Sequence, residues 1–593
     1  MDPHAEYTSR LDQRRNEASR LRNAHRLIGN LRLVTALAGA AAGWFAFGQL
    51  TLSPAWLIAP AALFAGLVVY HTRILREYDL VSRAVGFYEL GLARLEDRWA
   101  GMGESGERFC DPHHVYSDDL DLFGKGSLFQ LLSTARTRAG EDTLAGWLLE
   151  HPDAAGVRAR QQAVAELRPG LDLREKLAVH GETVRSGINP AAITAWGEQP
   201  AVRFPPGSRV VAPLIAASAL ITFSLYMAGV TNRTPFLIAL MAVFALWFVL
   251  RAPAVKVVNA VESPARDLAL LSELLRILEG ARFEAPLLAS LHARLGAGGL
   301  VASKRIGQLR RLVELLDWQR HMIFAPIAVV LLWGPQLAMA IESWRRRAGS
   351  SIGTWIATVG EFEALLSLAG YGFEHPQDPF PEFVDAPGFF DAEGLGHPLM
   401  REAQSIRNNL QLGENPRLLV VSGSNMSGKS TLLRSIGLNT VLAWAGGPVR
   451  ARRLALSRVR PGASIRIVDS LQEGRSRFYA EITRLRQILD LTASGDPVLF
   501  LIDEMLSGTN SHDRRIGAEA IVRGLLDRGA FGLITTHDLA LADIPSRLAY
   551  PAVNVHFEDS IEDGQIHFDY LLRPGVVEHS NALELMRSVG LEV

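Results

Sequence analysis

The sequence predicts a multidomain fold with three kinds of region. These are transmembrane helical hairpins, an all-α core with lever helices, and a carboxyl-terminal α/β domain of the P-loop class. Three observations predict it. The chain has 593 residues, too many for one hydrophobic core. It contains paired, uncharged apolar runs, and the stretch "RLLVVSGSNMSGKST" places a glycine-rich loop directly after an apolar strand.

The membrane hairpins are predicted from two pairs of apolar runs. Residues 33–50 and 54–70 carry no charge and are separated by the short turn "TLS". A second pair, 210–230 and 234–250, is joined by "TNR". Each run approaches or reaches the roughly 17 to 25 residues that a spanning helix needs. The alternative is four buried core helices; we expect two helical hairpins that cross a membrane.

Basic residues lie on the side of these hairpins opposite the short turns. They are Arg10, Arg14, Arg15, Arg20, Arg22, Arg26, Arg73, Arg76, Arg251 and Lys256. Because cytoplasmic flanks of membrane helices are enriched in Lys and Arg, most of the chain is expected in the cytoplasm. The predicted location is the cell inner membrane, as a multi-pass protein with its carboxyl-terminal domain inside.

A fifth apolar run, 322–341, is predicted not to cross the membrane. Pro326 and Pro335 interrupt it, and basic residues flank both of its ends. One more crossing would also export the glycine-rich loop to a side without ATP. We expect a buried or membrane-dipping helical element here.

Composition excludes some classes of function. The formal net charge is −1, so the chain has no global basic surface for nucleic acid. The only cysteine is Cys110, which excludes an internal disulfide framework and a cysteine-based metal cluster. A catalytic thiol has no supporting motif around it, so a structural thiol is the better interpretation of Cys110.

The glycine-rich loop has the GxxxxGKS pattern of a phosphate-binding loop. Gly423 and Gly428 allow successive backbone N–H groups to face phosphate oxygens, and the following helix adds its positive end. Lys429 would bridge the β- and γ-phosphates, and the hydroxyl of Ser430 would bind Mg²⁺. The predicted nucleotide-binding residues are Gly423, Ser424, Asn425, Met426, Ser427, Gly428, Lys429, Ser430 and Thr431. The sequence therefore predicts ATP and Mg²⁺ as cofactors.

Two later strands complete the predicted site. The apolar residues 498–502 form a buried strand that ends in Asp503 and Glu504. Asp503 is a predicted Mg²⁺ ligand, and Glu504 is the predicted catalytic carboxylate that polarises the attacking water. The strand "GLITT" ends at His537, which is expected to sense the γ-phosphate or to position water. The alternatives are an acidic pair that caps a strand and a structural histidine.

These segments resemble the MutS family. "GSNMSGKST" is similar to its Walker A loop, "DSLQEGRSRFYAEITRLRQIL" to its signature segment, and "IDEMLSGTNSHD" with "TTHD" to its Walker B, D-loop and switch histidine. The tail "FDYLLRPGVVEHSNALELMRSVGL" resembles the family's final hairpin and helix pair. The resemblance implies an ATPase of the ABC type that works as a homodimer. It implies that Ser476, next to Arg475, contacts the nucleotide of the opposite protomer. Ser427 and Arg477 depart from the family pattern.

The resemblance extends more weakly to the helical region. Residues 127–180 look like the MutS core domain, and 355–376 resemble its lever helix. We therefore expect a MutS-like helical core and levers between the membrane segments and the ATPase domain. The predicted boundaries are 1–80 for the basic amino terminus and first hairpin, 81–208 for the core part, 209–251 for the second hairpin, 252–385 for lever and core helices, and 386–593 for the ATPase domain.

The mismatch-recognition domain of the family is not found in the sequence. "GFYEL" offers Phe87 and Glu89 as a wedge, but the surrounding residues have helical periodicity. The predicted function is that of a membrane-anchored ATPase that moves helical levers. The alternative is a DNA-binding mismatch repair or recombination factor, and an ABC-like transporter is weaker still. Expected partners are a second copy of the chain, the membrane and an unidentified protein; DNA is a candidate that neither charge nor a recognition domain supports.

Overall fold

A computed structural model of the chain describes residues 2–577 apart from short gaps. The gaps are 186–188, 297–300, 323, 467–476, 507, 539–540 and 563–564. The chain forms two compact units. The first comprises Met1–Thr134, Thr143–Leu171 and Ala364–Val593, and the second comprises Ala135–Asp142 and Asp172–Glu363.

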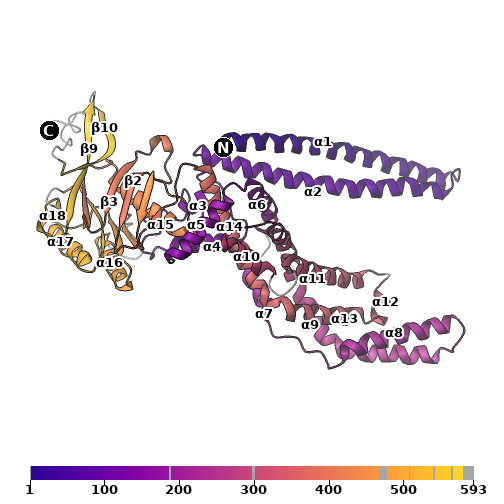
Figure 1. The fold of residues 1–593 in the computed structure, drawn as a ribbon. Coiled ribbons are helices and arrows are strands. Elements are labelled where there is room, and N and C mark those ends of the chain that lie inside the picture. Colours follow the sequence, from indigo (N-terminus) through magenta and orange to yellow (C-terminus); the bar gives the residue numbers. More distant parts are fainter. Residues whose placement is uncertain are drawn as a thin grey trace. The chain divides into compact units, whose positions relative to one another are not determined.

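The first unit begins with a long helical hairpin (Figure 1). Helix α1 spans Pro3–Gly43 and continues as a π-helical turn at Trp44–Gly48. A 3-10 turn at Pro54–Leu57 leads into α2, which spans Ile58–Leu95. Asp2 caps α1 by accepting a hydrogen bond from the His4 backbone at 3.0 Å. The predicted pair of helices at 33–50 and 54–70 is therefore present.

A buried ion pair fixes the base of this hairpin. Arg94 near the end of α2 donates two hydrogen bonds to Glu374, from Nε to Oε2 at 2.7 Å and from Nη2 to Oε1 at 2.5 Å. The Tyr7 hydroxyl of α1 donates to the same carboxylate at 3.1 Å. Burial alone would lower the pKa of Arg94, but the Glu374 carboxylate raises it above its usual value. The guanidinium is therefore charged and paired inside the protein.

The stretch considered as a DNA wedge is part of α2. Phe87 is buried and packs edge-on against Tyr88, with ring centroids 5.2 Å apart. Glu89 accepts a hydrogen bond from Arg15 of α1 at 2.8 Å. The helical interpretation of this stretch is confirmed, and these side chains are committed to packing within the hairpin.

Shorter helices follow the hairpin along the chain. They are α3 (Leu128–Leu132), α4 (Arg138–Leu149), α5 (Ala154–Leu167), α6 (Leu171–Arg185) and α7 (Pro190–Glu198). Helix α14 (Ile352–Glu374) passes from the second unit into the first. Its Glu363 accepts hydrogen bonds within the second unit from the backbones of Arg136 at 3.0 Å and Thr137 at 3.2 Å, so the short segment before α4 is held against α14.

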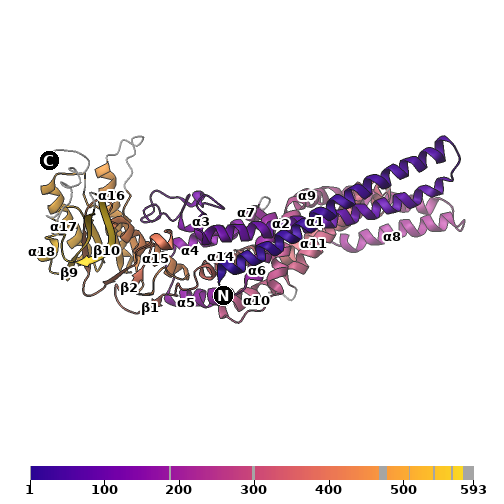
Figure 2. The same ribbon diagram turned by 90° about the horizontal axis from the view of Figure 1, so that it is seen from above.

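The second unit contains another helical hairpin. Helix α8 spans Ser208–Met227, and α9 spans Thr234–Glu279 and extends far beyond the apolar run 234–250. The two helices pack side by side (Figures 1 and 2). Small residues of α8, including Ala212 and Ala219, are buried against Ala239 and Val243 of α9. The remaining helices of this unit are α10 (Pro286–Gly296), α11 (Ala302–Asp317), α12 (Ala325–Val330) and α13 (Trp333–Ala348).

The fifth apolar run is divided between two helices. Within this run, Ala325–Val330 form α12 and the residues from Trp333 onward begin α13, and the break falls at Leu332, whose φ is 50°. Pro326 lies in the first turn of α12, where its missing N–H costs no helical hydrogen bond. The left-handed conformation of Leu332 therefore interrupts the helix between the two prolines, and 322–341 is not one continuous helix.

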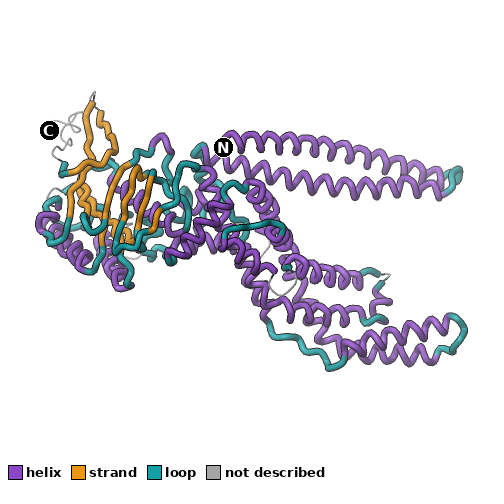
Figure 3. The backbone as a smooth tube through the Cα atoms, in the orientation of Figure 1, coloured by secondary structure: helices purple, strands orange, loops and turns teal. Residues whose placement is uncertain are grey.

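Strands of the described chain lie only within residues 382–574, coloured orange in Figure 3. A four-stranded sheet has the order β1-β5-β2-β3, with β1 Glu382–Phe383, β5 Arg453–Leu456, β2 Phe390–Leu395 and β3 Asn408–Leu412. A six-stranded sheet has the order β10-β9-β4-β8-β7-β6. Its strands are β10 Gln565–Pro574, β9 Ala552–Glu562, β4 Leu418–Ser422, β8 Phe531–Thr536, β7 Val498–Ile502 and β6 Arg460–Ser464.

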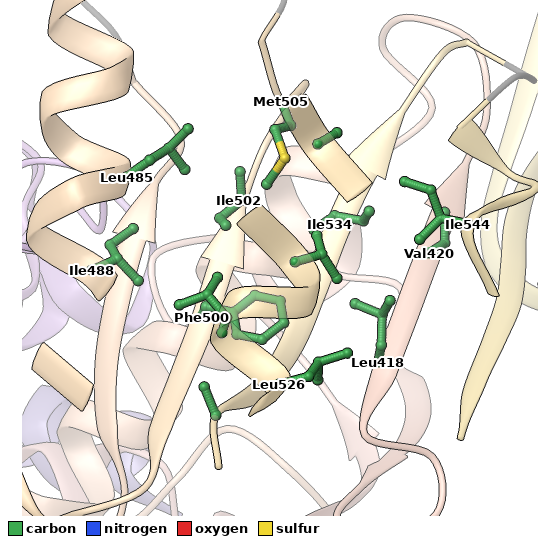
Figure 4. Close-up of a cluster of buried hydrophobic side chains, with 14 of the residues drawn as sticks. Leu418, Val420, Leu485, Ile488, Phe500, Ile502, Met505, Leu526, Ile534 and Ile544 are labelled. Carbon is green, nitrogen blue, oxygen red and sulfur yellow. The ribbon is translucent and has the colours of Figure 1, made fainter. Parts of the chain in front are cut away.

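The six-stranded sheet is covered by helices on both faces. Strands β6, β7, β8, β4 and β9 are parallel, and β10 pairs antiparallel with β9. One face packs against α16 (Arg477–Leu491), α17 (Ser511–Asp527) and α18 (Ile544–Arg547) through the cluster in Figure 4. On the other face, α15 (Lys429–Ala445) packs closely enough that a Cβ on Gly437 would lie 3.1 Å from Leu501. Burial on both faces explains why β7 is apolar throughout and why β4 and β8 carry polar side chains only at their carboxyl ends.

Candidate functional site

The glycine-rich loop joins β4 to α15. Gly423 has a φ of 151° and Gly428 a φ of 104°, which side-chain-bearing residues rarely adopt. A Cβ on Gly423 would meet Ser427 Oγ at 2.8 Å, and one on Gly428 would meet the Tyr570 ring at 3.1 Å. Met426 also has a positive φ of 69°, whereas Ser427 does not. The departure at Ser427 from the family glycine therefore causes no backbone strain.

The side chain of Lys429 reaches back across the glycine-rich loop that precedes it. Its Nζ donates to the carbonyl oxygens of Gly423 at 2.9 Å and Ser424 at 2.7 Å. The side chain is buried, and burial lowers the pKa of Lys429 despite nearby carboxylates that act in the opposite direction. The cation is thus held at the centre of the loop by neutral acceptors, which a stronger anionic acceptor can replace.

The carboxyl ends of β7 and β8 meet the start of α15. Asp503 accepts a hydrogen bond from Ser430 Oγ at 2.5 Å, and its second carboxylate oxygen accepts one from Thr535 of β8. Thr535 Oγ1 also accepts from the Glu504 backbone at 3.0 Å. The structure therefore brings Ser430 and Asp503 together as the sequence predicts. Thr535, which orients both acidic residues, was not predicted.

Glu504 and His537 are neighbours at the same edge of the sheet. His537 Nδ1 lies 3.6 Å from Glu504 Oε1, and both side chains are partly exposed. Glu504 has a φ of 44° and Leu506 one of 55°, so the turn after β7 is strained. The buried carboxylate of Glu481 in α16 accepts a hydrogen bond from the Leu506 backbone and holds this turn. Glu481 belongs to the signature segment, but the site residues predicted from that segment were only Ser476 and Arg475.

A pocket of about 730 Å³ opens over the loop. Asn425, Met426, Thr431 and Glu504 contribute to its wall on the loop side. The wall away from the loop was not predicted and comes from Leu395, His397, Met400, Gln404, Ser405, Ile406, Asn408, Phe557, Phe568, Asp569 and Tyr570. All predicted residues of the loop except Gly423, Ser424 and Ser427 line the pocket.

Asn408 joins the two strands that form the unpredicted wall. Its Nδ2 donates to the Tyr570 carbonyl at 3.0 Å, and its Oδ1 accepts from the Leu572 backbone at 2.8 Å. These bonds bridge the irregularity in β10 between Phe568 and Leu572, where Tyr570 has a φ of 54°. The rings of Phe568 and Tyr570 are stacked with centroids 5.7 Å apart. The bulge turns Tyr570 toward Gly428 of the loop.

His397 is a buried, neutral part of the pocket wall. Burial, and to a lesser extent Arg434, lowers its pKa to about 4. Its Nδ1 accepts a hydrogen bond from the Leu399 backbone at 3.2 Å, which places the ring proton on Nε2. His397 therefore offers a neutral N–H donor rather than a positive charge.

Comparison with known proteins assigns this region. The family profile described as MutS domain V matches residues 419–592, from β4 onward. The carboxyl-terminal part of the chain belongs to the MutS family. The match covers the glycine-rich loop, strand β7 with the acidic residues that follow it, and strand β8 with His537 after it. Ser476 and Arg475, predicted to act on the opposite protomer, lie within it but outside the described residues.

Curated MutS relatives match over a limited region. The DNA mismatch repair protein MutS of Natronomonas pharaonis is 36% identical over 241 residues, which is 39% of this chain and 27% of that protein. The DNA mismatch repair protein MutS 2 of Haloarcula marismortui is 41% identical over 182 residues, 30% of this chain and 18% of that protein. Endonuclease MutS2 of Thermus thermophilus is 35% identical over 203 residues, which is 33% of this chain and 25% of that protein. The chain thus spans about a quarter or less of the length of these relatives.

Proposed function

We propose that the chain is a membrane-anchored ATPase of the MutS type. It binds ATP with Mg²⁺ in the pocket over the glycine-rich loop and hydrolyses ATP as a homodimer. It couples closure of the two ATPase domains to movement of helical levers. The observation that carries the proposal is the meeting of Lys429, Ser430, Asp503 and Glu504 at one edge of the sheet.

The loop fits a nucleotide's phosphates. Among the described residues, the buried hydroxyl oxygens of Ser424 and Ser427 have no hydrogen-bond partner. A buried hydroxyl without a partner costs about 1–3 kcal/mol; neither serine lines the pocket, so an anionic ligand would recover this cost only if the loop adjusts around it. The pocket volume of about 730 Å³ lies within the range of small-molecule sites. Its apolar wall, including Ile406 and Tyr570, suits a nucleoside.

The roles of the polar residues follow from their positions. Lys429 would exchange its two carbonyl acceptors for oxygens of the β- and γ-phosphates. Ser430 and Asp503 would supply oxygen ligands to Mg²⁺, which when bound neutralises phosphate charge. Glu504 would orient the attacking water, with His537 beside it. The family resemblance places Ser476 of a second copy against the nucleotide, which would make the homodimer the active unit.

The metal assignment can be tested with two carboxylates of the same pocket. We expect Asp503→Asn to abolish ATP hydrolysis and to remove the Mg²⁺ dependence of nucleotide binding. Asp569→Asn, which changes a carboxylate on the opposite wall, should keep both. Binding would be followed by titration calorimetry with ATP, with and without Mg²⁺. Equal behaviour of the two variants would contradict the assignment of Asp503.

The membrane anchors are proposed from long apolar helices. Among the residues that the structure describes, five helices are long and apolar enough to cross a membrane. The most apolar windows of the first four are 6–17% buried, whereas that of the fifth, in Trp333–Glu374, is 78% buried. Large apolar side chains on the first four face outward, for example Ile58 at 70% and Phe248 at 73% exposed. This contrast supports two spanning hairpins and an internal position for Trp333–Glu374, the segment that comprises α13 and α14.

Cysteine labelling can test the inner-membrane topology. In a Cys110→Ser background, we expect Leu52→Cys and Asn232→Cys to react with an impermeant maleimide added to intact cells. The native Cys110 is exposed and lies in the segment predicted to be cytoplasmic, so it should react only after permeabilisation. The reverse pattern would overturn the proposed topology.

The proposed coupling has a physical route within the first unit. Four residues after Glu374, at the end of α14, Asp378 pairs with Arg450 at 3.2 Å. Arg450 also pairs with Glu402, and its backbone donates to Asn439 of α15 at 2.6 Å. Since α15 begins at Lys429, contiguous polar contacts run from the end of the lever helix to the helix of the loop. Such a network can carry a displacement in either direction.

A DNA-binding repair function is the second candidate, and the names of the relatives favour it. Two of them are named DNA mismatch repair proteins and one an endonuclease. The test is competition binding of a mismatched against a matched duplex at physiological salt. We expect weak, salt-sensitive binding without a preference of tenfold, or about 1.4 kcal/mol. A larger preference would move the chain among the mismatch readers.

A further inference from the structure

A second pocket lies wholly within the second unit. It has a volume of about 540 Å³ and lies between the start of α8, helix α11 and helix α13. Its lining residues are Arg209, Gln308, Arg311, Leu312, Gln336, Met339, Ala340, Ser343, Trp344 and Arg347. None of these residues is acidic. The pocket is separate from the nucleotide site, which belongs to the first unit.

The rim of this pocket carries uncompensated positive charge. Within the described part of the chain, Arg209, Arg311 and Arg347 form no ion pair; Arg347 donates only to the Ser343 carbonyl, at 3.2 Å. Nearby arginines behave differently, since Arg310 pairs with Glu314 at 2.9 Å and Arg345 with Glu342 at 2.8 Å. Among the described residues, the three guanidinium groups that line the pocket therefore have no carboxylate partner.

The floor of the pocket is apolar. Met339 and Trp344 of α13 are almost fully buried beneath it, and Leu312 of α11 is partly buried. The Trp344 indole N–H donates to the Arg305 carbonyl at 2.8 Å, which fixes the ring. A cationic rim over an apolar floor matches a ligand that has both an anionic group and a hydrocarbon part.

The pocket lies where the chain enters the second apolar hairpin. Arg209 directly precedes the apolar run 210–230, and Arg251 directly follows the run 234–250. If these runs span the membrane as proposed, the rim lies at the level of the lipid headgroups. Basic residues at this level attract the anionic lipids of the cytoplasmic leaflet.

We propose that this pocket binds an anionic phospholipid. Arg209, Arg311 and Arg347 hold the headgroup phosphate, and the floor formed by Met339 and Trp344 receives the adjoining hydrocarbon. The assignment rests on the proposed membrane anchoring. The pocket suits a lipid better than a nucleic acid, because a phosphodiester backbone has no hydrocarbon chain that would contact the apolar floor and the neighbouring spans.

The experiment uses the full chain in neutral detergent micelles. Phosphatidylglycerol and phosphatidylcholine of the same acyl length are added in equal amounts, and the lipids retained are counted by native mass spectrometry. The test variant is R209Q/R311Q/R347Q. The control variant, R276Q/R294Q/R310Q, removes the same charge from arginines that are paired elsewhere in the unit.

We expect the wild type and the control to retain phosphatidylglycerol over phosphatidylcholine, and the test variant to lose at least about tenfold of that preference. Equal preference in the test variant and the wild type would overturn the site. So would displacement by inorganic phosphate alone, or a short duplex whose binding requires the same three arginines.

Flotation with vesicles separates the two levels of the proposal. A chain that floats with neutral vesicles but shows no lipid preference refutes the pocket and leaves the anchoring intact. A chain that floats with neither neutral nor anionic vesicles refutes both. Circular dichroism of the test variant checks that its helices are retained, and the single variants provide the same comparison if the triple variant misfolds.

Discussion

Replacing Glu374 by glutamine should loosen the first helical hairpin from the end of α14. The side chain keeps its size, but the buried guanidinium of Arg94 loses its counter-charge. Both partners of this pair are nearly inaccessible, with exposed side-chain fractions of 5% and 1%. Removing one partner of a buried ion pair typically costs about 3–5 kcal/mol, because the remaining charge stays in a poorly solvated place.

The same hairpin offers a matched control. Arg15 and Glu89 form an ion pair at 2.8 Å between α1 and α2, but their side chains are 55% and 48% exposed. Water screens such a pair, so Glu89→Gln should cost only about 0–1 kcal/mol. The two substitutions remove the same charge from ion pairs of similar length. The expected difference of several kcal/mol therefore arises from burial.

Native-state hydrogen exchange of the detergent-solubilised protein measures this difference. The amides at the start of α1, around Tyr7, should exchange about 10²–10⁴-fold faster in Glu374→Gln, as about 3–5 kcal/mol of local stability implies. Exchange in Glu89→Gln should stay within about fivefold of the wild type. If both variants exchange alike, the buried pair does not hold the hairpin and the reasoning fails.

Three further predictions concern the nucleotide site and α14. Lys429→Ala should abolish measurable ATP binding in calorimetry while circular dichroism stays unchanged; unchanged affinity would contradict the loop assignment. Glu504→Gln should bind ATP, turn over about 10²–10⁴-fold more slowly and accumulate a dimer in size-exclusion chromatography; near-normal turnover would assign the role elsewhere. Burial, which outweighs the hydrogen bonds from Thr137 and Arg136, raises the pKa of Glu363 to about 7. The folded protein therefore keeps this proton longer than the unfolded chain, and its stability should fall by about 3 kcal/mol as pH rises from about 4.5 to 7. Hydrogen exchange of α14 should show this slope in the wild type, and its persistence in Glu363→Gln would contradict the assignment.

The part of the site that the sequence predicts lies at the ends of parallel strands. Loops after β4, β7 and β8 meet at one edge because neighbouring parallel strands point the same way. Local motifs could therefore place Lys429, Asp503 and His537 together without any knowledge of long-range packing. Thr535 lies in β8, two residues before His537, which directly follows that strand, and the role of Thr535 follows only from the register of β8 against β7.

The opposite wall of the pocket could not be predicted, because it depends on contacts between distant residues. Asn408 meets Tyr570 only because β3 and the irregular part of β10 lie side by side, and a single sequence carries no signal for that pairing. The pair of Arg94 with Glu374 is a similar case. Each residue stands in a helix with ordinary periodicity, and nothing local marks either as buried.

The sequence predicted the presence of the helical hairpins, but not the length of their helices. Apolar runs identified both hairpins, but α9 continues to Glu279 although it contains Pro253 and Pro264. Proline costs a helix one hydrogen bond and produces a kink, and packing of the long apolar face can offset that cost. In the fifth run the two prolines lie near helix starts, and the break falls between them at Leu332.

The buried pair also constrains how ATP could act on the hairpins. Helix α14 carries Glu363 in the second unit and Glu374 in the first, and its 23 residues form one continuous helix. Breaking the contact between Glu374 and Arg94 would cost about 3–5 kcal/mol, a large part of what ATP binding can supply to a conformational change. A displacement of α14 that starts at the nucleotide site should therefore carry the base of the first hairpin with it. The movement must then be absorbed where contacts are weaker, in the exposed apolar faces of the hairpins that the membrane would surround.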